Sequence, residues 1–158
     1  MNNYTLTLFN TEGSEELYVS TAKDRLDELN AKMSTLTDDE YDELEELQMV
    51  TEEMKNGEAE PISSILNVPF ELCDVMFTTA QVISDDGVVT DSIRTIVSYK
   101  ANEKKSVFAS NSKIFAEKVL AILNIAGNPR HWRRPRKYVV KEVKTKNGHT
   151  YTILPYRG

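Results

Sequence analysis

Residues 70–100 read FELCDVMFTTAQVISDDGVVTDSIRTIVSYK, and this stretch decides the fold. Both of its halves are rich in β-branched and aromatic residues, which are typical of β-strands. An Asp-Asp-Gly sequence at 85–87 lies between the halves and favours a turn. The stretch therefore predicts a long β-hairpin, with one strand over 70–83 and the other over 88–100.

Two more elements are predicted directly after this hairpin. A polar turn leads to a short third strand over 106–109. Asn111 or Ser112 then caps a helix whose apolar residues recur at helical spacing, and Gly127 ends it. This helix connects the three-stranded part to the C-terminal part of the chain.

A second hairpin is predicted near the C-terminus. Asn147-Gly148 is the strongest short hairpin signal in the chain, because both residues tolerate positive φ. It predicts that strands over 138–144 and 149–154 pair with each other. The order of three strands, a helix and two strands resembles an OB-fold, a five-stranded barrel that binds oligonucleotides. The predicted class is α+β, mainly β, with an OB-like barrel.

The N-terminal part of the chain predicts further elements before this barrel. Alternating apolar residues indicate strands over 4–9 and 17–19 that pair as a short hairpin. Capping-box patterns at Thr21 and Thr37 begin two helices, and Asn56-Gly57 ends the second. We therefore expect a β-hairpin followed by an acidic α-helical hairpin.

The charge of the chain changes sign between these two parts. Residues 1–60 hold 17 acidic and 4 basic side chains, a net of -13, whereas residues 61–158 hold 8 acidic and 15 basic, a net of +7. The overall net charge of -6 thus conceals a basic region. We place a domain boundary at this change, with 1–60 as an acidic extension and 61–158 as an OB-like nucleic-acid-binding domain.

The most basic segment runs from Arg130 to Lys137 and contains Trp132, the only tryptophan of the chain. Its five Arg and Lys side chains repel one another unless an anion is near. Such cations neutralise phosphates, and an indole ring stacks on an unpaired base. The segment therefore predicts binding of single-stranded DNA or RNA. The alternative is a solvated basic loop whose tryptophan closes the end of the barrel.

Other candidate contacts extend this segment along the predicted strands. The cationic candidates are Arg94, Lys100, Arg130, Arg133, Arg134, Arg136, Lys137, Lys141, Lys144 and Lys146. The candidates for base stacking are Tyr99, Phe108, Trp132 and Tyr138. Alternation along the strand over 138–144 predicts that Val139 and Val143 face the core, which leaves Tyr138 and Lys144 exposed. For Arg94 and Lys100 a plain surface role is equally compatible with the sequence.

Three short sequences within residues 70–154 carry a family resemblance. They are Gly87-Val88-Val89-Thr90-Asp91-Ser92-Ile93-Arg94-Thr95, Ala109-Ser110-Asn111-Ser112, and Gly127-Asn128-Pro129 leading to Trp132 and the strand over 139–143. They resemble small single-stranded DNA-binding proteins of bacteriophages and mobile elements of Gram-positive bacteria. The resemblance implies binding with little sequence preference during phage or mobile-element DNA replication. Cellular single-strand-binding proteins end in an acidic tip, whereas this chain ends in Leu154-Pro155-Tyr156-Arg157-Gly158, so tail-mediated recruitment of partners is not implied.

The acidic helical hairpin leaves several roles open. It could be a solvated pair of helices whose apolar stripe packs on the barrel. It could dimerise or dock a replication partner through Leu44, Leu47, Val50 and Met54, or its carboxylates over 38–46 could cover the basic groove until nucleic acid displaces them. Alternatively, the hairpin mimics nucleic acid and engages a host DNA-handling enzyme, which would make the protein an inhibitory module. A duplex-binding regulator is a further alternative.

Other functional classes have weaker signals. Cys73 is the only cysteine, and with two histidines it supplies too few ligands for a usual zinc site. We expect no enzymatic activity and no cofactor, because the chain lacks a phosphate-cradling glycine loop, a serine elbow and a helix with paired histidines. No apolar run approaches the roughly 20 residues that span a bilayer. We therefore expect a cytoplasmic protein without membrane contact.

Overall fold

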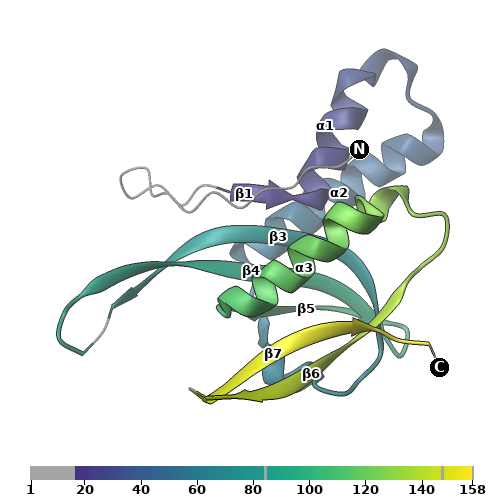
Figure 1. Ribbon diagram of the computed structural model, residues 1–158. Coiled ribbons are helices and arrows are strands. Elements are labelled where there is room, and N and C mark those ends of the chain that lie inside the picture. The colour runs from purple at the N-terminus through teal and green to yellow at the C-terminus, as the bar shows by residue number, and fades with distance from the viewer. Residues whose placement is uncertain (1–16, 84, 147, 158) are drawn as a thin grey trace.

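The computed structural model describes residues 17–83, 85–146 and 148–157, and it is α+β with mainly β structure (Figure 1). The strands are β1 (Leu17–Ser20), β2 (Glu60–Pro61), β3 (Phe70–Ile83), β4 (Val89–Ala101), β5 (Lys104–Ser110), β6 (Lys137–Thr145) and β7 (Gly148–Pro155). The helices are α1 (Thr21–Ala31), α2 (Asp38–Asn56) and α3 (Lys113–Ala126), with 3-10 turns η1 (Met33–Thr35), η2 (Ile62–Ile65) and η3 (Pro129–His131). The sheet is a curled half-barrel with the strand order β2-β5-β4-β3-β6-β7, and β1 pairs with β3 beside this path.

Both predicted hairpins of the barrel region are confirmed. β3 and β4 pair antiparallel from Glu71 opposite Lys100 to Ile83 opposite Val89. Their turn contains Gly87 at φ +81°, a conformation that glycine adopts at little cost. β6 and β7 also pair antiparallel over nearly their whole length. The predicted order of three strands, a helix and two strands is therefore present.

The concave face of the sheet holds the main core. Phe70, Tyr99, Phe108 and Phe115 form a chain of ring contacts with centroid distances of 5.4 to 5.9 Å, and all four side chains are buried. Phe115 comes from α3, which lies across this face (Figure 1). Tilted and edge-on ring contacts of this kind stabilise a core beyond the burial of apolar area.

The inward face of β6 differs from the prediction. Tyr138 and Val140 belong to the main core, whereas Val143 is 40% exposed. Only the first two residues of β6 pair with β3, where Tyr138 lies opposite Phe70. Val140 also bridges Leu66, but beyond it the strand extends past the core with β7 as its paired neighbour, so Val143 has little to pack against. The expectation that Val139 and Val143 form the core set is thus wrong, although Val139 is itself buried.

The two predicted N-terminal helices are confirmed, with one change at a cap. Thr37 caps α2 in a reciprocal capping box with Glu40. α1 is capped by Ser20, whose hydroxyl accepts a hydrogen bond from the Lys23 backbone N–H, and not by Thr21 as predicted. Thr21 is the first helical residue, and its hydroxyl bonds to β3 instead. The predicted strand over 4–9 lies outside the described residues.

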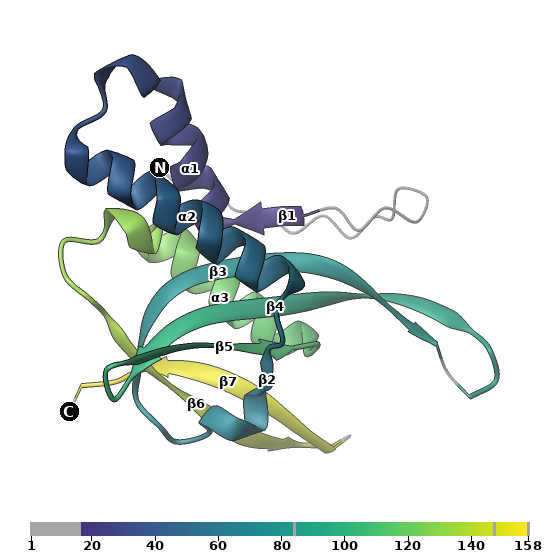
Figure 2. The same ribbon diagram turned by 180° about the vertical axis from the view of Figure 1, so that it is seen from behind.

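The acidic extension and the half-barrel share one sheet and one set of packed side chains. β1 pairs with β3, where Val19 lies opposite Phe77, and β2 pairs with β5. α2 lies across the convex face of the sheet, opposite to α3 (Figure 2), and its Met54 packs there against Met76 and Ile96. The boundary placed between residues 60 and 61 therefore separates segments that the structure joins.

The apolar stripe of α2 faces the molecule's own interior. Leu44 and Leu47 are buried in a cluster with Leu29 of α1, and Val50 packs against that cluster. Met54 is 3% exposed. Docking of a second chain through these four α2 residues would require the hairpin to unpack first. Leu44 and Leu47 pack within the hairpin, and Val50 and Met54 extend this packing to the sheet.

Candidate nucleic-acid interface

A cleft of about 860 Å³ lies between the basic segment and the C-terminal residues. We call residues 130–137 the basic arm and this cavity the main cleft. The cationic side chains that line it are Arg133, Arg134, Arg136, Lys137 and Arg157. Trp132, Tyr138 and Tyr156 contribute aromatic residues to the lining, which contains no Asp or Glu among the described residues. Such a cleft attracts an anion and presents ring faces beside it.

Hydrogen bonds to its backbone hold the basic arm at both ends. At its start, the Asn128 side chain caps η3 by accepting a hydrogen bond from the Arg130 N–H at 2.9 Å. At its end, the Arg136 carbonyl accepts from Leu72 N–H at 3.2 Å, and the Lys137 carbonyl accepts from Tyr156 N–H at 2.9 Å. Apart from the half-buried Trp132, the residues between these anchors are exposed. The arm is thus a fixed loop that presents its cations to solvent.

Trp132 lies at the boundary between the core and the main cleft. Its indole N–H donates to the Ala126 carbonyl at 2.8 Å, and the side chain packs against the main core. The Arg136 guanidinium lies 5.1 Å from the ring centroid, a cation–π distance. Trp132 is half-buried, and it both packs on the core and lines the main cleft. Its position is therefore compatible with both interpretations made from the sequence, base stacking and closure of the end of the barrel.

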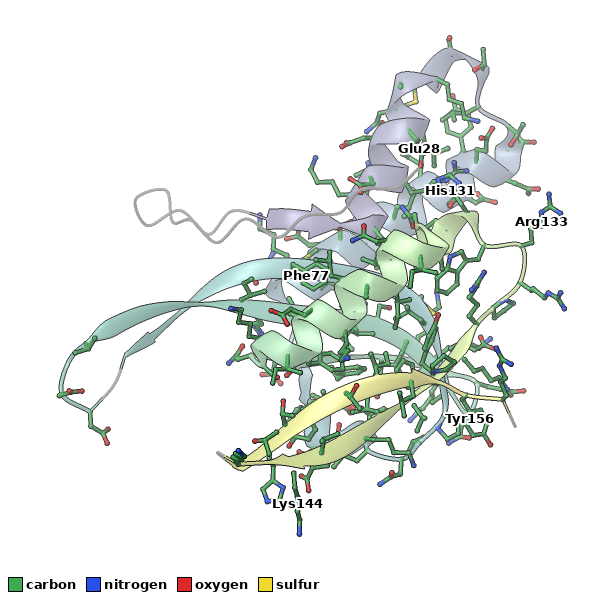
Figure 3. All side chains as sticks on the ribbon, viewed as in Figure 1. Glu28, Phe77, His131, Arg133, Lys144 and Tyr156 are labelled. Carbon is green, nitrogen blue, oxygen red and sulfur yellow. The ribbon has the colours of Figure 1, made fainter. Side chains whose placement is uncertain are left out.

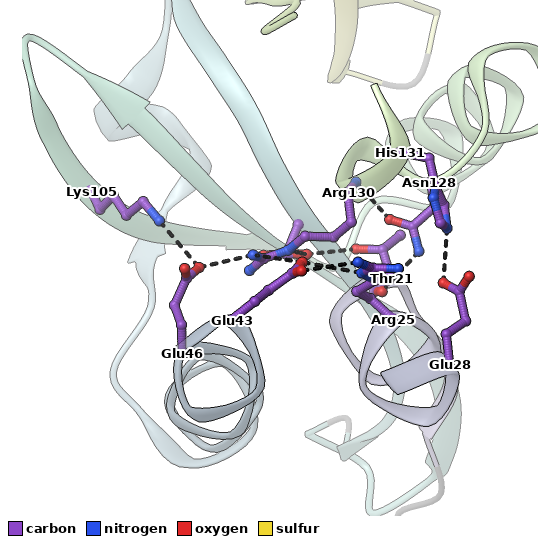
Figure 4. A network of polar contacts seen from close by, with 10 residues as sticks. Thr21, Arg25, Glu28, Glu43, Glu46, Lys105, Asn128, Arg130 and His131 are labelled. Carbon is purple, nitrogen blue, oxygen red and sulfur yellow. Dashed lines mark hydrogen bonds and ion pairs between the residues drawn. The ribbon is translucent and has the colours of Figure 1, made fainter. Parts of the chain in front are cut away.

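Arg130 was predicted as a phosphate contact, and the structure places it in a buried ion pair instead. Its side chain is 13% exposed and makes two hydrogen bonds to Asp74, at 3.1 and 2.7 Å (Figure 4). The Asp74 side chain is 1% exposed and requires a cationic partner at this depth. Burial opposes the charge of the guanidinium, but its hydrogen bonds to Asp74 outweigh this and raise the pKa of Arg130. Arg130 is therefore withdrawn from the set of predicted nucleic-acid contacts.

This ion pair is the centre of a polar network that joins the basic arm to both N-terminal helices (Figure 4). Thr21 of α1 accepts from Val75 N–H at 2.9 Å and donates to Asp74 at 3.1 Å. The Asn128 amide donates to the Thr21 carbonyl at 2.9 Å. From α2, Glu46 accepts from Arg130 at 2.9 Å. The acidic hairpin therefore fixes the start of the arm.

Three of the four predicted stacking residues are buried in the core. Tyr99 and Tyr138 are each 5% exposed, and Phe108 is 0% exposed. Burial raises the pKa of the Tyr138 hydroxyl, and the Tyr99 hydroxyl donates to Glu60 at 3.1 Å. A base cannot reach the rings of Tyr99 and Phe108 without opening the core, and Tyr138, although it lines the main cleft, exposes only 5% of its surface. Their assignment as stacking residues is therefore corrected to core packing.

The other predicted cations lie apart from the main cleft. Lys141, Lys144 and Lys146 are exposed on the distal part of the β6–β7 hairpin, and Lys144 lies far from Arg133 (Figure 3). Lys137 and Lys144 are separated by seven strand residues, or roughly 23 Å. Arg94 is half-buried on β4 near Glu60. Lys100 is exposed near the end of β4, where Glu71 of β3 separates it from Lys137 of the arm.

Two contributors to the main cleft were missed from the sequence. Tyr156, which is 40% exposed, and Arg157 line it from the C-terminal end of the chain. Together they combine an aromatic ring with a cation, as the arm does. This composition was the only feature of the sequence that could have identified them as contributors to the cleft. Their position depends on the hydrogen bond from Tyr156 N–H to the Lys137 carbonyl, which brings residues 19 positions apart together.

The described residues offer few other functional sites. Cys73 is half-buried, and burial raises the pKa of its thiol, which therefore stays protonated. In residues 17–83, 85–146 and 148–157, no three or more His, Cys, Asp or Glu side chains are grouped to hold a metal ion. None of the described helices is both long and apolar enough to cross a membrane. No family model, curated protein or solved structure matches this chain.

Proposed function

We propose that the protein binds single-stranded DNA in the main cleft with little sequence preference. The observation that carries this proposal is the lining of the cleft, which joins five cations to Trp132 and Tyr156 and has no Asp or Glu among its described residues. Cations of this kind neutralise phosphates, and aromatic rings stack on bases whatever their identity. A duplex offers the phosphates but not the base faces, because its bases are already stacked on one another.

In this proposal, residues 70–155 form an OB-like barrel that serves DNA replication in a phage or mobile element. The strand order around α3 and the pairing of β3 with β6 support the comparison with an OB-fold. OB-folds use the face of their second and third strands for ligands. Here the corresponding strands are β4 and β5. Their convex face is covered by α2, whose Met54 packs against Ile96 of β4 and Val107 of β5. The main cleft is therefore the better candidate for the DNA site.

The proposal is tested by titrating the protein with fluorescent oligo-dT, a duplex of equal length and an equivalent RNA over a salt series. We expect the single-stranded DNA to bind more tightly than the duplex. The titration with RNA measures any preference between the two single-stranded ligands. Log affinity should fall with log salt by about 0.7 per phosphate contact, or about 3.5 if all five cations engage. Equal affinity for duplex and single strand, or indifference to salt, would contradict the proposal.

The inhibitory-module alternative has less support from the contacts. Several carboxylates of the acidic hairpin already bind side chains of the same chain: Glu28 binds His131, Glu43 binds Arg25, and Glu46 binds Arg130. These groups are therefore not presented to a partner as a row of phosphate mimics. A folded protein that binds no nucleic acid but binds and inhibits a host DNA-handling enzyme would reverse this preference.

Trp132→Ala is expected to weaken binding of oligo-dT by roughly 1 to 3 kcal/mol, because it removes a stacking face. The salt slope should remain nearly unchanged, since no charge is lost. Affinity is measured by the same titration, and circular dichroism confirms folding because Trp132 also packs against the core. Trp132→Phe is the matched control, since it keeps an aromatic face. A folded Trp132→Ala variant with wild-type affinity would limit Trp132 to its packing role.

A further inference from the structure

A second, smaller cavity lies beside the basic arm. Its volume is about 330 Å³, and we call it the small cleft. It shares the arm residues Trp132, Arg133, Arg134 and Pro135 with the main cleft, so these four residues line both cavities. Lys105 of β5 adds a further cation to its lining, which unlike that of the main cleft also holds two carboxylates, Glu46 and Glu71. The two cavities are therefore adjacent, with the arm between them.

The strand register continues the positive charge beyond the small cleft. Lys137 of β6 lies opposite Glu71 of β3, Glu71 lies opposite Lys100 of β4, and Lys100 lies opposite Lys105 of β5. Residues directly opposite one another in a sheet share a face. A transverse row of three lysines and one glutamate thus crosses four strands at the end of the sheet where the arm lies.

Lys100 and Lys105 form a like-charge pair that a bound anion would stabilise. Both side chains are exposed, and like charges directly opposite each other on a sheet are destabilising. The carboxylates nearby are Glu71, in the row itself, and Glu46, which lies 3.6 Å from Lys105 but is also bound to Arg130 (Figure 4). These contacts offset only part of the positive charge that Lys100, Lys105 and the arm bring together.

We propose that the small cleft is a second subsite for the phosphodiester backbone of single-stranded nucleic acid. The strand in the main cleft crosses the arm at residues 132–135, and its following phosphates bind Lys105 and Lys100. This inference rests on the function proposed for the main cleft and adds the path by which the bound strand crosses the arm. Lys105 becomes a contact that the sequence did not indicate.

The subsite predicts a dependence on strand length. The test compares Lys100→Gln/Lys105→Gln with wild type on oligo-dT of about 4 and about 16 nucleotides, the range of site sizes of OB-type domains. Two lost phosphate contacts should weaken binding of the long oligomer about 25-fold at about 0.1 M salt and flatten its log-log slope by about 1.4. The short oligomer, which fills the main cleft, should bind within about twofold of wild type.

The control variant is Lys113→Gln/Lys118→Gln, which removes two exposed lysines from α3 with the same change of net charge. It should bind both oligomers as wild type does. The subsite is refuted if the Lys100/Lys105 variant binds the long oligomer as tightly as this control, or if it loses affinity for both lengths equally. If wild type binds neither oligomer, the function proposed for the main cleft fails instead. Thermal unfolding of both variants verifies that the fold is retained.

Discussion

Arg130→Ala is expected to destabilise the protein by about 3 to 5 kcal/mol, because it leaves the Asp74 carboxylate buried without its cationic partner. The loss is measured as a lower free energy of unfolding in urea denaturation. A double-mutant cycle with Asp74→Ala should show that the two losses are not additive, since the residues are in direct contact. This interaction energy would establish that the pair acts as a unit.

The matched control is Lys23→Ala, which breaks the exposed ion pair with Asp27 on α1. Such a pair contributes only about 0.3 to 0.5 kcal/mol, so the control should change stability very little. Arg130→Lys keeps the charge but cannot reproduce the two-pronged hydrogen bonding to Asp74, and it should be intermediate in stability. If Arg130→Ala is as stable as wild type but flattens the salt slope of DNA binding, Arg130 is a phosphate contact after all.

Replacing Arg133, Arg134 and Arg136 together by alanine is expected to weaken binding of oligo-dT about 100-fold at about 0.1 M salt. Three phosphate contacts at about 0.7 each change log affinity by about 2, and the salt slope should flatten by the same amount. Titration over a salt series measures both quantities. The fold should be retained, because these side chains are exposed on the arm.

A second triple variant separates the main cleft from the wider set of cations predicted from the sequence. Replacing Lys141, Lys144 and Lys146 by alanine removes the same charge from the distal β6–β7 hairpin. The main cleft predicts a much smaller loss for this variant, whereas a strand bound along β6 would make the two losses similar. Similar losses would therefore move the binding surface from the arm to β6.

Several parts of the candidate site could be predicted from the sequence. The density of Arg and Lys around one tryptophan identified the arm, and Arg133, Arg134, Arg136 and Lys137 do line the main cleft. Composition could not distinguish Arg130 from them. Its role depends on Asp74, which is 56 residues away and carries no local signal of its burial. The same holds for Tyr156, which reaches the cleft only through its contact with β6.

The sequence by itself determined the local elements of this protein. The hairpins, the α2 capping box and the end of α3 at Gly127 each depend on residues within a few positions of one another. Their signals come from local hydrogen bonds, backbone conformational preferences and the spacing of apolar side chains. These elements can therefore be recognised from the sequence alone.

Only the tertiary structure decided which faces of these elements are buried and how the acidic extension is used. Tyr138 and Val143 are both plausible core residues by alternation, and the short pairing of β6 with β3 buries the first and leaves the second exposed. The change of charge near residue 60 suggested separate domains, but opposite charges also attract. Glu46 of the acidic extension binds Arg130, and β1 joins the sheet at β3. Burial and pairing depend on partners far apart in the chain, and the register that brings those partners together is a property of the whole fold.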